Sequence, residues 1–254
     1  MHSTVVIVGL GEVGKPLMEI MKSRYQIFGV DINQPASIPR CDVMHICFPF
    51  QSGEFVGQVV EYIDQYRPAL TVINSTVAPG TTRSIAVESR TAVVHSPVRG
   101  KHARMQEELL HYTKFVGALD PRSGQRAAEH FERVGIKTSL LSSPETSEIA
   151  KLTETTYFGL LIAWAQEVER YCVKLGANYD EVVSFYDEIK FFPPVKYFSG
   201  VIGGHCVMPN IAILRQQFSS GLVEAIVKSD ALKRKNLGPE GWLEASGSSA
   251  AKPN

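Results

Sequence analysis

A glycine-rich turn near the start of the chain constrains the fold more than any other feature. Residues 4–9 read Thr-Val-Val-Ile-Val-Gly, a β-branched run typical of a strand that is buried on both faces of a parallel sheet. The pattern GxGxxG follows at Gly9, Gly11 and Gly14, and the residues up to about Ser23 have helical character. In such a unit the first glycine permits a tight turn, the second lets the backbone approach a pyrophosphate, and the third lets helix and strand pack closely. The spacing therefore predicts a dinucleotide-binding strand, turn and helix.

The phosphates and the ribose of the dinucleotide have candidate partners in the same segment. The start of the helix, with Glu12 and Val13 in the turn before it, offers backbone donors and the positive end of the helix dipole to a pyrophosphate. Asp31 lies 22 residues after Gly9, at the end of a second predicted strand at residues 26–31, where its carboxylate can accept hydrogen bonds from both ribose hydroxyls. The same charge would repel a 2′-phosphate. The sequence therefore predicts NAD as the cofactor, in preference to NADP.

The rest of the first half alternates between short apolar runs and stretches of helical character. The further runs are at residues 43–48, 70–74, 92–94 and 114–117. This alternation predicts an α/β fold, with an open, Rossmann-like parallel sheet that is covered by helices. We expect this NAD-binding Rossmann domain to span residues 1–141.

From Pro144 onward the pattern changes to that of one long helix. Apolar residues recur at three- and four-residue steps, and Gly176 is a suitable stop signal. A glycine-rich loop at residues 199–206 and a helical segment from about Asn210 to Lys235 follow. We expect a long connecting helix and a small helical domain for substrate binding or dimerisation at residues 142–236, and a disordered, low-complexity tail at residues 237–254.

Composition excludes several classes of partner. The chain has 26 Lys and Arg against 26 Asp and Glu, so it has no global electrostatic reason to bind nucleic acid or an anionic membrane. Its longest apolar stretches, such as Val5–Leu10 and Tyr157–Ala165, are shorter than the roughly 18 residues that a membrane helix needs, and no signal peptide is expected. The four cysteines are spaced too irregularly for a metal site and too sparsely for a disulfide scaffold. We therefore expect a cytoplasmic protein without a metal, a membrane span or a nucleic-acid partner.

Four later segments go beyond what a bare dinucleotide-binding domain needs. They are residues 74–81 (NSTVAPGT), 95–100 (HSPVRG), 148–155 (EIAKLTET) and 203–210 (GGHCVMPN). Together, and in this order, they resemble the UDP-glucose/GDP-mannose dehydrogenase family of nucleotide-sugar dehydrogenases, over residues from about 4 to about 235. The most specific elements are the STVxxGT stretch, the E-x-x-K turn of the long helix and GGxC.

The resemblance implies a four-electron oxidation of a sugar primary alcohol. In that chemistry NAD takes a hydride, a cysteine captures the aldehyde as a thiohemiacetal, a second hydride transfer leaves a thioester, and water releases the carboxylate. Cys206 would then be the nucleophile, and Lys151 would stabilise the developing oxyanion as a fixed cation. Thr76 would hold a water molecule or a substrate hydroxyl near the nicotinamide.

Further site residues come from the same motifs. Ser75 is expected beside the cofactor, next to Thr76. Glu148 and Thr155 lie on the same helical face as the candidate lysine and can flank it. Asn210 stands where the family carries an acid that prepares the hydrolytic water.

Five other polar residues allow both a functional and a structural interpretation. His95 and His102 could approach the cofactor edge or cap turns. Arg99 and Lys101 could meet a substrate phosphate or remain surface charges. His205 is expected to be structural, because adjacent side chains in an extended loop diverge from one another.

The chain departs from the family pattern at several positions of the site, and the basic residue that the family carries directly before its acid is absent from Val207-Met208-Pro209-Asn210. Thr155 stands where the family has Asn, Asn210 where it has Asp, and Val98 where it has Glu. Because an amide cannot serve as a general base, the two carboxylates that would activate the hydrolytic water are missing. We therefore expect the release of the acid, which is the second half of the chemistry, to be impaired.

The predicted substrate is a small molecule, and the resemblance implies a nucleotide sugar. The chain ends where the family begins a C-terminal domain that closes over the UDP group. We expect either a substrate other than a UDP-sugar, a partner subunit that supplies those contacts, or a shortened chain. The long helix is also expected to form a homodimer, because several large apolar side chains exceed what one flank of a helix needs, namely Tyr157, Phe158, Leu161 and Trp164.

Two other functions remain open at this point. A β-hydroxyacid dehydrogenase shares the plan of a Rossmann domain and a helical domain, uses a lysine such as Lys151 on the interdomain helix, and needs one hydride transfer and no cysteine. The GGHC and STVAPGT segments argue against it. The other alternative is a non-catalytic NAD-binding pseudoenzyme, and the retained Lys151 and Cys206 argue against that.

Overall fold

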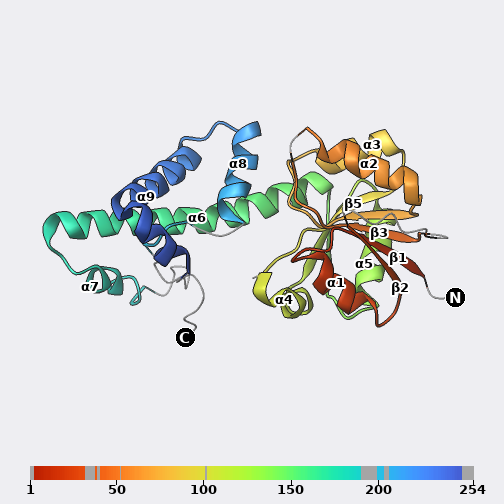
Figure 1. Cartoon of the computed structure of the whole chain (residues 1–254), viewed down its shortest axis with the longest axis horizontal. Coiled ribbons are helices and arrows are strands. Elements are labelled where there is room, and N and C mark those ends of the chain that lie inside the picture. Colours follow the sequence, from red (N-terminus) through yellow and green to blue (C-terminus); the bar gives the residue numbers. More distant parts are fainter. Residues whose placement is uncertain are drawn as a thin grey trace. The chain divides into compact units, whose positions relative to one another are not determined.

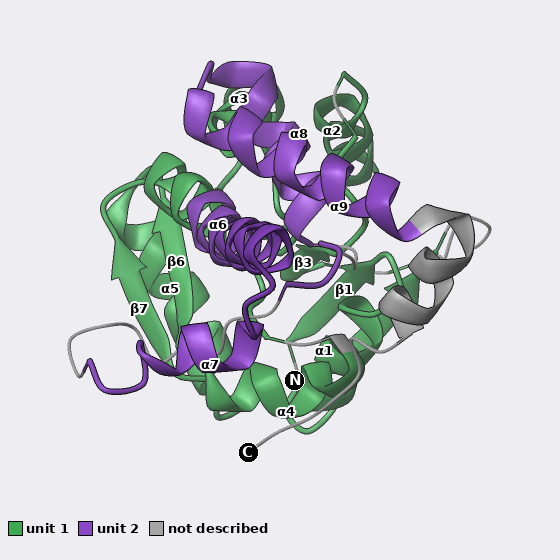
Figure 2. Ribbon diagram, turned by 90° about the vertical axis from the view of Figure 1, so that its left-hand side faces the viewer, with its two compact units in different colours: residues 1–151 green, residues 152–254 purple. Residues whose placement is uncertain are grey.

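The computed structural model of the chain describes residues 3–31, 38, 41–51, 53–100, 102–189, 199–202 and 206–247 (Figure 1). The chain divides into two compact units, residues 1–151 and residues 152–254, which Figure 2 shows in different colours. The long helix α6, Pro144–Leu175, begins in the first unit and continues into the second. Each unit is described separately below.

Unit 1 is built on one sheet. Its strands are β1 (Thr4–Val8), β2 (Gln26–Val30), β3 (Val43–Ile46), β4 (Leu70–Ile73), β5 (Val93–His95), β6 (Lys114–Ala118) and β7 (Thr138–Leu141). Among the described residues they form a seven-stranded sheet in the order β2-β1-β3-β4-β5-β6-β7. Strands β1 to β5 are parallel, as the sequence predicts, and the Rossmann-like α/β fold is confirmed.

The sheet differs from the prediction at its β6 edge. Strand β6 pairs antiparallel with β5, and β7, which the sequence did not indicate, pairs parallel with β6. Among its described residues, the connection between β5 and β6 contains one 3-10 turn, His102–Arg104, and the short helix α4, Met105–His111. Seven residues at 1.5 Å each extend about 10 Å, too short to cross the face of the sheet and return the chain to the opposite edge. The chain therefore turns back, and β6 runs against its neighbour.

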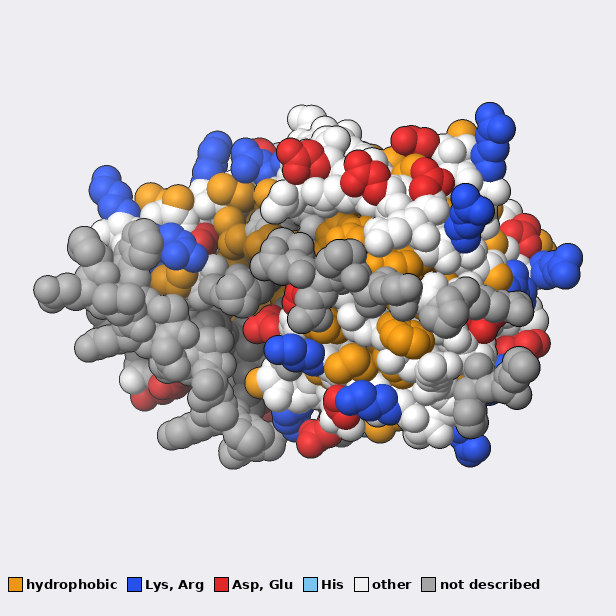
Figure 3. Space-filling model, turned by 45° about the vertical axis from the view of Figure 1, so that its right-hand side comes forward, with side chains coloured by type: hydrophobic (Ala, Val, Ile, Leu, Met, Phe, Trp, Pro, Cys, Tyr) orange, Lys and Arg blue, Asp and Glu red, His pale blue; other side chains and the backbone are white. Residues whose placement is uncertain are grey.

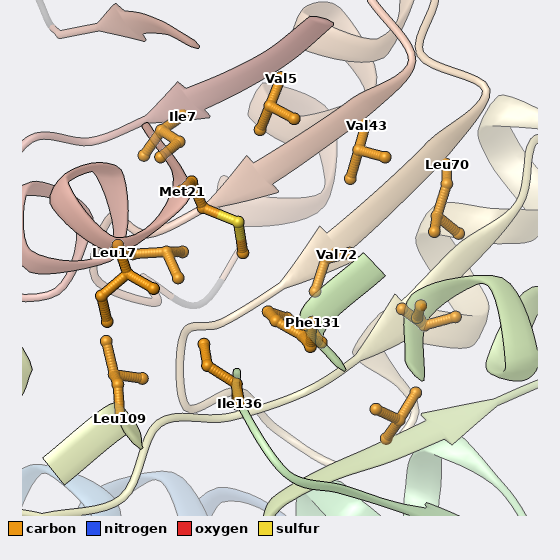
Figure 4. Packing of buried hydrophobic residues seen from close by; sticks show 14 of the residues in the cluster. Val5, Ile7, Leu17, Met21, Val43, Leu70, Val72, Leu109, Phe131 and Ile136 are labelled. Atoms are coloured by element: carbon orange, nitrogen blue, oxygen red, sulfur yellow. The ribbon is translucent and has the colours of Figure 1, made fainter. Parts of the chain in front are cut away.

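Helices cover both faces of the sheet (Figure 1). On one face lie α1 (Gly14–Met21), α4 and α5 (Pro121–Glu132); on the other lie α2 (Phe55–Tyr66) and α3 (Thr81–Ser89). Alternate side chains of β1 serve the two cores, since Val5 and Ile7 pack with Leu17 and Phe131 in one cluster, whereas Val6 and Val8 belong to the other. Figure 4 shows the first cluster. All of β1 is buried, as expected for a strand covered on both faces.

Unit 2 consists of helices in its described part. Helix α6 begins at Pro144 and ends at Leu175, before Gly176, which confirms the predicted start and stop. The other helices are α7 (Tyr179–Ser184), α8 (Val207–Gln217) and α9 (Gly221–Gly247). The predicted helical segment from about Asn210 to Lys235 is therefore two helices with a break between them, and α9 continues into the segment for which the sequence predicts disorder.

A small apolar cluster holds the helices of unit 2 together. Its buried members are Ile162, Ala163, Ile202, Val207, Ile211 and Ile226. Gly159 of α6 allows the close approach of α8, because a Cβ at this position would lie 2.8 Å from Cγ1 of Val207. Within the described part of the chain, no helix combines the length and the apolar character that crossing a membrane requires.

Charges are mixed on the surface. On the face that Figure 3 shows, Lys and Arg side chains are interspersed with Asp and Glu. The acidic and basic residues, which are equal in number in the chain, thus do not gather into separate patches of one charge among the described residues of that face.

Candidate functional site

The glycine-rich turn has the geometry that close packing around a dinucleotide requires. Gly9 follows β1 with φ +91°, and a Cβ there would lie 2.8 Å from the backbone N of Phe48. A Cβ at Gly14 would lie 1.9 Å from the carbonyl oxygen of Gly9. A Cβ at Gly11 would meet no atom within 4 Å, so the backbone at Gly11 borders open space. Two glycines are therefore required by packing, and Gly11 leaves room for a ligand.

This turn lies where the order of the strands reverses. Strand β1 has β2 on one side and β3 on the other, and open α/β sheets bind their ligands in the crevice at the carboxyl ends of such strands. Gly9 ends β1, and its N–H donates to the carbonyl oxygen of Val30 at the end of β2 (2.9 Å). Asp31 comes directly after Val30 and is exposed. The structure therefore brings the turn and Asp31 together at this edge, an arrangement that fits a dinucleotide.

The start of α1, near the same turn, has no side-chain cap. Val13 is the N-cap residue and has no side-chain oxygen with which to cap the first amides, and Glu12 is exposed in the turn before it. The N–H of Lys15 donates to the carbonyl oxygen of Gly11 (3.2 Å) and fixes the turn. Residues 32–37, which follow Asp31, lie outside the described residues.

The loop Ser75–Gly80, which follows β4, is held at its start by two hydrogen bonds. The hydroxyl of Ser75 donates to the carbonyl oxygen of Phe48 (2.5 Å), and the carbonyl oxygen of Ser75 accepts from Nε2 of His95 (3.1 Å). Thr76 is half-buried directly after this fixed point. The sequence predicted Ser75 and Thr76 as site residues, and they lie at the carboxyl edge of the sheet.

Glu148 holds the end of the same loop. Its two carboxylate oxygens accept hydrogen bonds from the backbone N–H groups of Gly80 (2.7 Å) and Thr82 (2.9 Å). Glu148 is fully buried, which raises its pKa, while these hydrogen bonds oppose the rise. Gly80 is the N-cap of α3 and has no side chain, so Glu148 supplies the acceptor that a capping residue would give. The described contacts of Glu148 are therefore structural.

His95 is buried in a hydrogen-bonded link between β5 and α6. Its Nδ1 lies 2.6 Å from the hydroxyl of Ser147, and burial lowers its pKa to about 3. The ring is therefore neutral at ordinary pH. Of the two interpretations of His95, contact with the cofactor or local structure, these contacts support the second. The side chain of His102 and the whole of Lys101 and His205 lie outside the described residues.

Lys151 lies on α6 one helical turn after Glu148 and is half-buried. Its positive charge contributes to the lowered pKa of His95 and to that of Lys114. Lys114 is a further buried lysine near the same sheet edge, and its Nζ donates to the carbonyl oxygen of Ser96 (2.6 Å). Sequence reasoning missed Lys114, because one lysine at the start of an apolar run looks like an ordinary strand boundary.

Three further predicted residues lie in unit 2. Cys206 is half-buried and is the N-cap residue of α8. Asn210, one turn later, is buried, and its Nδ2 donates to Oγ1 of Thr155 (3.0 Å), which itself donates to the carbonyl oxygen of Leu152 (3.0 Å). Two of the positions that depart from the family pattern, Thr155 and Asn210, are therefore hydrogen-bonded to each other.

The segment before the glycines of GGHC is also fixed. The N–H of Ile202 donates to the buried carboxylate of Asp230 (2.7 Å), and Gln166 donates to the carbonyl oxygen of Gly200 (2.7 Å).

In unit 1, the guanidinium of Arg99 lies over the rings of Tyr112 and Phe115, 5.3 and 5.5 Å from their centres. Arg99 is thus packed in place by cation–π contacts.

Comparison with known proteins finds a family match in the second half of the chain. Residues 145–233, which include Lys151, Glu148, Cys206 and Asn210, match the central domain of the UDP-glucose/GDP-mannose dehydrogenase family. The family resemblance is confirmed. The chain is 24% identical over 253 residues to the UDP-N-acetyl-D-mannosamine dehydrogenase of Methanocaldococcus jannaschii, with 80% of this chain and 59% of that protein covered. The chain thus spans about three fifths of the length of this curated relative.

Solved structures show the same fold. The UDP-D-ManNAc dehydrogenase of Pyrococcus horikoshii superposes with a TM-score of 0.78 at 21% identity, over 90% of this chain and 68% of that one. The 3-hydroxyisobutyrate dehydrogenase of Mycobacterium tuberculosis superposes with a TM-score of 0.73 at 15% identity, over 99% of this chain and 100% of that one. At these identities the similarity establishes the fold alone.

Proposed function

We propose that this chain provides the catalytic part of an NAD-dependent dehydrogenase that oxidises a primary alcohol of a nucleotide sugar. One observation carries the proposal: the match to the family's central domain includes both Lys151 and Cys206. It follows a turn at which Gly9, Gly11 and Gly14 have the packing that a dinucleotide needs. The named relatives, a UDP-N-acetyl-D-mannosamine dehydrogenase among them, support a nucleotide sugar as the substrate.

The cofactor is assigned to the edge of unit 1 described above. Gly9, Gly11 and Gly14 would let the backbone and the start of α1 approach the pyrophosphate, and Asp31 would accept from the ribose hydroxyls. The negative charge of Asp31 favours NAD over NADP. When bound, NAD supplies the acceptor for the hydride that leaves the alcohol carbon.

Three residues of the chain have the other chemical roles in the proposed reaction. Lys151 stabilises the negative charge that develops on the alcohol oxygen, and the hydroxyl of Thr76 holds a water molecule or a substrate hydroxyl. The thiolate of Cys206 adds to the carbonyl carbon of the aldehyde and forms a thiohemiacetal. Loss of a second hydride and a proton from this adduct leaves a thioester on Cys206.

Hydrolysis of the thioester is the weak step of the proposed reaction. Val98 is apolar, and the amide of Asn210 already donates to Thr155, so neither can take a proton from water. We therefore propose that the acylated Cys206 is long-lived, and that the reaction slows after the second oxidation.

The proposed protein is a cytoplasmic homodimer. Tyr157, Trp164 and Tyr171 recur at seven-residue spacing along α6, and each is about half exposed, between 47% and 50%. A stripe of exposed aromatic side chains at this spacing supports a contact with the same helix of a second copy.

Product counting tests the proposed function. The protein is incubated without oxygen with NAD or NADP and, in turn, with UDP-sugars, other sugar nucleotides and 3-hydroxy acids. The proposal predicts two NADH per molecule of one sugar nucleotide and a slower reaction with NADP. The Lys151→Ala variant should turn over about 100- to 1000-fold more slowly, because one fixed charge at a developing oxyanion contributes about that factor.

A second candidate is a β-hydroxyacid dehydrogenase. The superposition on 3-hydroxyisobutyrate dehydrogenase over both full chains favours it at the level of the fold. One NADH per molecule of a 3-hydroxy acid, with a rate unchanged in Cys206→Ser, would select this reaction. No NADH from any compound would leave a protein that binds NAD without turnover, and would contradict both enzyme proposals.

A further inference from the structure

Two consecutive polar residues at the start of α6 are buried without being needed for the apolar core. Ser147 and Glu148 are 1% and 0% exposed. Polar side chains in such places have hydrogen-bond partners, and those partners show what the residues hold. The hydrogen bonds of Ser147 and Glu148 connect them to opposite ends of one loop, residues 75–80.

The first connection runs through His95. The hydroxyl of Ser147 lies 2.6 Å from Nδ1, and Nε2 lies 3.1 Å from the carbonyl oxygen of Ser75. The same hydroxyl donates to the carbonyl oxygen of Pro144 in the first turn of α6 (2.9 Å), and Nε2 faces a carbonyl oxygen, which can only accept. The start of the loop is thus linked to α6 through the buried ring of His95.

The second connection is direct. The carboxylate of Glu148 accepts from the amides of Gly80 (2.7 Å) and Thr82 (2.9 Å), at the end of the loop and the start of α3. Both oxygens are engaged. Replacing one of them by an NH₂ group would remove an acceptor and place two donors against each other.

A glycine in the sheet lets α6 come close enough for these bonds. Gly117 of β6 lies opposite His95 in the register of β5 and β6. A Cβ at Gly117 would lie 2.5 Å from the hydroxyl of Ser147 and 2.5 Å from the carbonyl oxygen of Ser143. Any larger residue at this position would push the first turn of α6 away from the sheet.

We propose that Ser147 and Glu148 are positioning residues for Lys151. Lys151 follows them by one helical turn, and Thr76 lies in the loop whose two ends they hold. The two residues thus keep the lysine and the threonine hydroxyl in a fixed relation. This inference rests on the proposed function, because it takes Lys151 and Thr76 as the groups that meet the substrate.

The activity test compares Ser147→Ala and Glu148→Gln with controls from the same turn. The controls are Ser142→Ala, which loses an exposed hydroxyl, and Glu145→Gln, which loses a partly exposed ion pair with Arg83. A misplacement of about 1 Å costs roughly 100-fold in rate, so we expect kcat to fall about 10- to 100-fold in both test variants. KM and the dissociation constant of NAD should change less than about threefold, since neither residue contacts the glycine turn.

A second readout does not depend on turnover. Reductive methylation followed by peptide mass spectrometry gives the rate at which the amine of Lys151 reacts, with the exposed Lys137 as internal reference. We expect this ratio to change by more than about threefold in both test variants and to stay constant in both controls. This readout decides the inference even if no compound yields NADH and the proposed function fails.

Either of two results would overturn the inference. One is a Lys151 reactivity in the test variants equal to that of the controls, and the other is a kcat equal to that of the controls. If Glu148→Gln does not fold, Gly117→Ala replaces it, because it displaces the same turn without removing a hydrogen-bonding group. The same two criteria then apply to Gly117→Ala.

Discussion

Lys114 is a buried side chain of unit 1 whose pKa is lowered by its surroundings. Its side chain is 3% exposed; its Nζ donates to the carbonyl oxygen of Ser96 and lies 5.0 Å from the centre of the Phe131 ring. Burial lowers its pKa from 10.5 to about 7; the nearby Lys151 lowers it further, and Cys47 opposes the shift. The folded protein thus gives up at about neutral pH a proton that the unfolded chain keeps until about pH 10.5.

This difference predicts a pH dependence of stability. Between the two pKa values the unfolded state binds more protons, so the contribution of Lys114 to the free energy of unfolding rises with pH, by at most about 1.4 kcal/mol per pH unit. Lys114→Met removes this dependence. In urea denaturation at pH 6.5 and 9.5, the wild type should gain stability relative to Lys114→Met as the pH rises. If the free energies of unfolding of the two proteins differ by the same amount at both pH values, the lowered pKa of Lys114 is refuted. Lys137→Met, at an exposed position, is the matched control.

At the residue scale the sequence predicted the parts of the site that depend on local pattern. The GxGxxG spacing predicted the tight packing found at Gly9 and Gly14, and the acid after the second predicted strand is the exposed Asp31, because these features depend on distance along one strand, turn and helix. The contact between Ser147 and His95 joins residues 52 positions apart. No local pattern encodes such a contact, and the sequence therefore left His95 with two interpretations.

At the scale of elements, α2 and α3 both end in an arginine with left-handed backbone. Arg67 has φ +46° and Arg90 has φ +54°, and both side chains are exposed. Glycine usually occupies this C-cap conformation, since a Cβ costs about 1–2 kcal/mol there. Arg67 also precedes Pro68, which restricts its backbone further.

Replacing Arg67 by glycine should therefore stabilise the protein. The strain relieved exceeds the entropy that glycine adds to the unfolded chain, and we expect a gain of up to about 1 kcal/mol. Arg67→Ala removes the same side chain but keeps the Cβ, so it should give no gain. Chemical denaturation of both variants measures the effect, and an equal change in the two would show that the side chain, and not the backbone, is responsible.

Some strands of the sheet can be predicted from the sequence and others cannot. Strands β1, β3 and β4 are continuous buried runs, which the sequence reveals directly. Strand β7 is only four residues long at the edge of the sheet, half-buried and without a continuous apolar run, so its sequence resembles a loop. The direction of β6 depends on how its connection packs, which apolar periodicity does not encode.

At the scale of the whole molecule, the two units contribute different parts of the proposed chemistry. Unit 1 carries the dinucleotide turn, Thr76 and Lys151, and unit 2 carries Cys206 together with the Thr155 and Asn210 pair. The helix α6 contributes to both units, and its sequence pattern was the clearest signal in the second half of the chain. In the proposed reaction, oxidation proceeds through a covalent bond to Cys206.

Asn210→Asp provides a variant that changes only the last step of that reaction. An aspartate at this position can accept from Oγ1 of Thr155 where Asn210 now donates to it, if the Thr155 hydroxyl turns away from the carbonyl oxygen of Leu152. The new carboxylate can take a proton from water. We therefore expect hydrolysis of the thioester to become faster, while both oxidations keep their rates.

Intact-protein mass spectrometry of the acid-quenched reaction detects this bond. After rapid mixing with NAD and the sugar nucleotide that yields NADH, the wild type should carry the mass of the acyl group on Cys206, at close to one per chain. The adduct should be shorter-lived in Asn210→Asp and absent from Cys206→Ser, because a serine hydroxyl is a much weaker nucleophile than a cysteine thiolate. Absence of the adduct from the wild type, together with full NADH yield and rate in Cys206→Ser, would contradict the account.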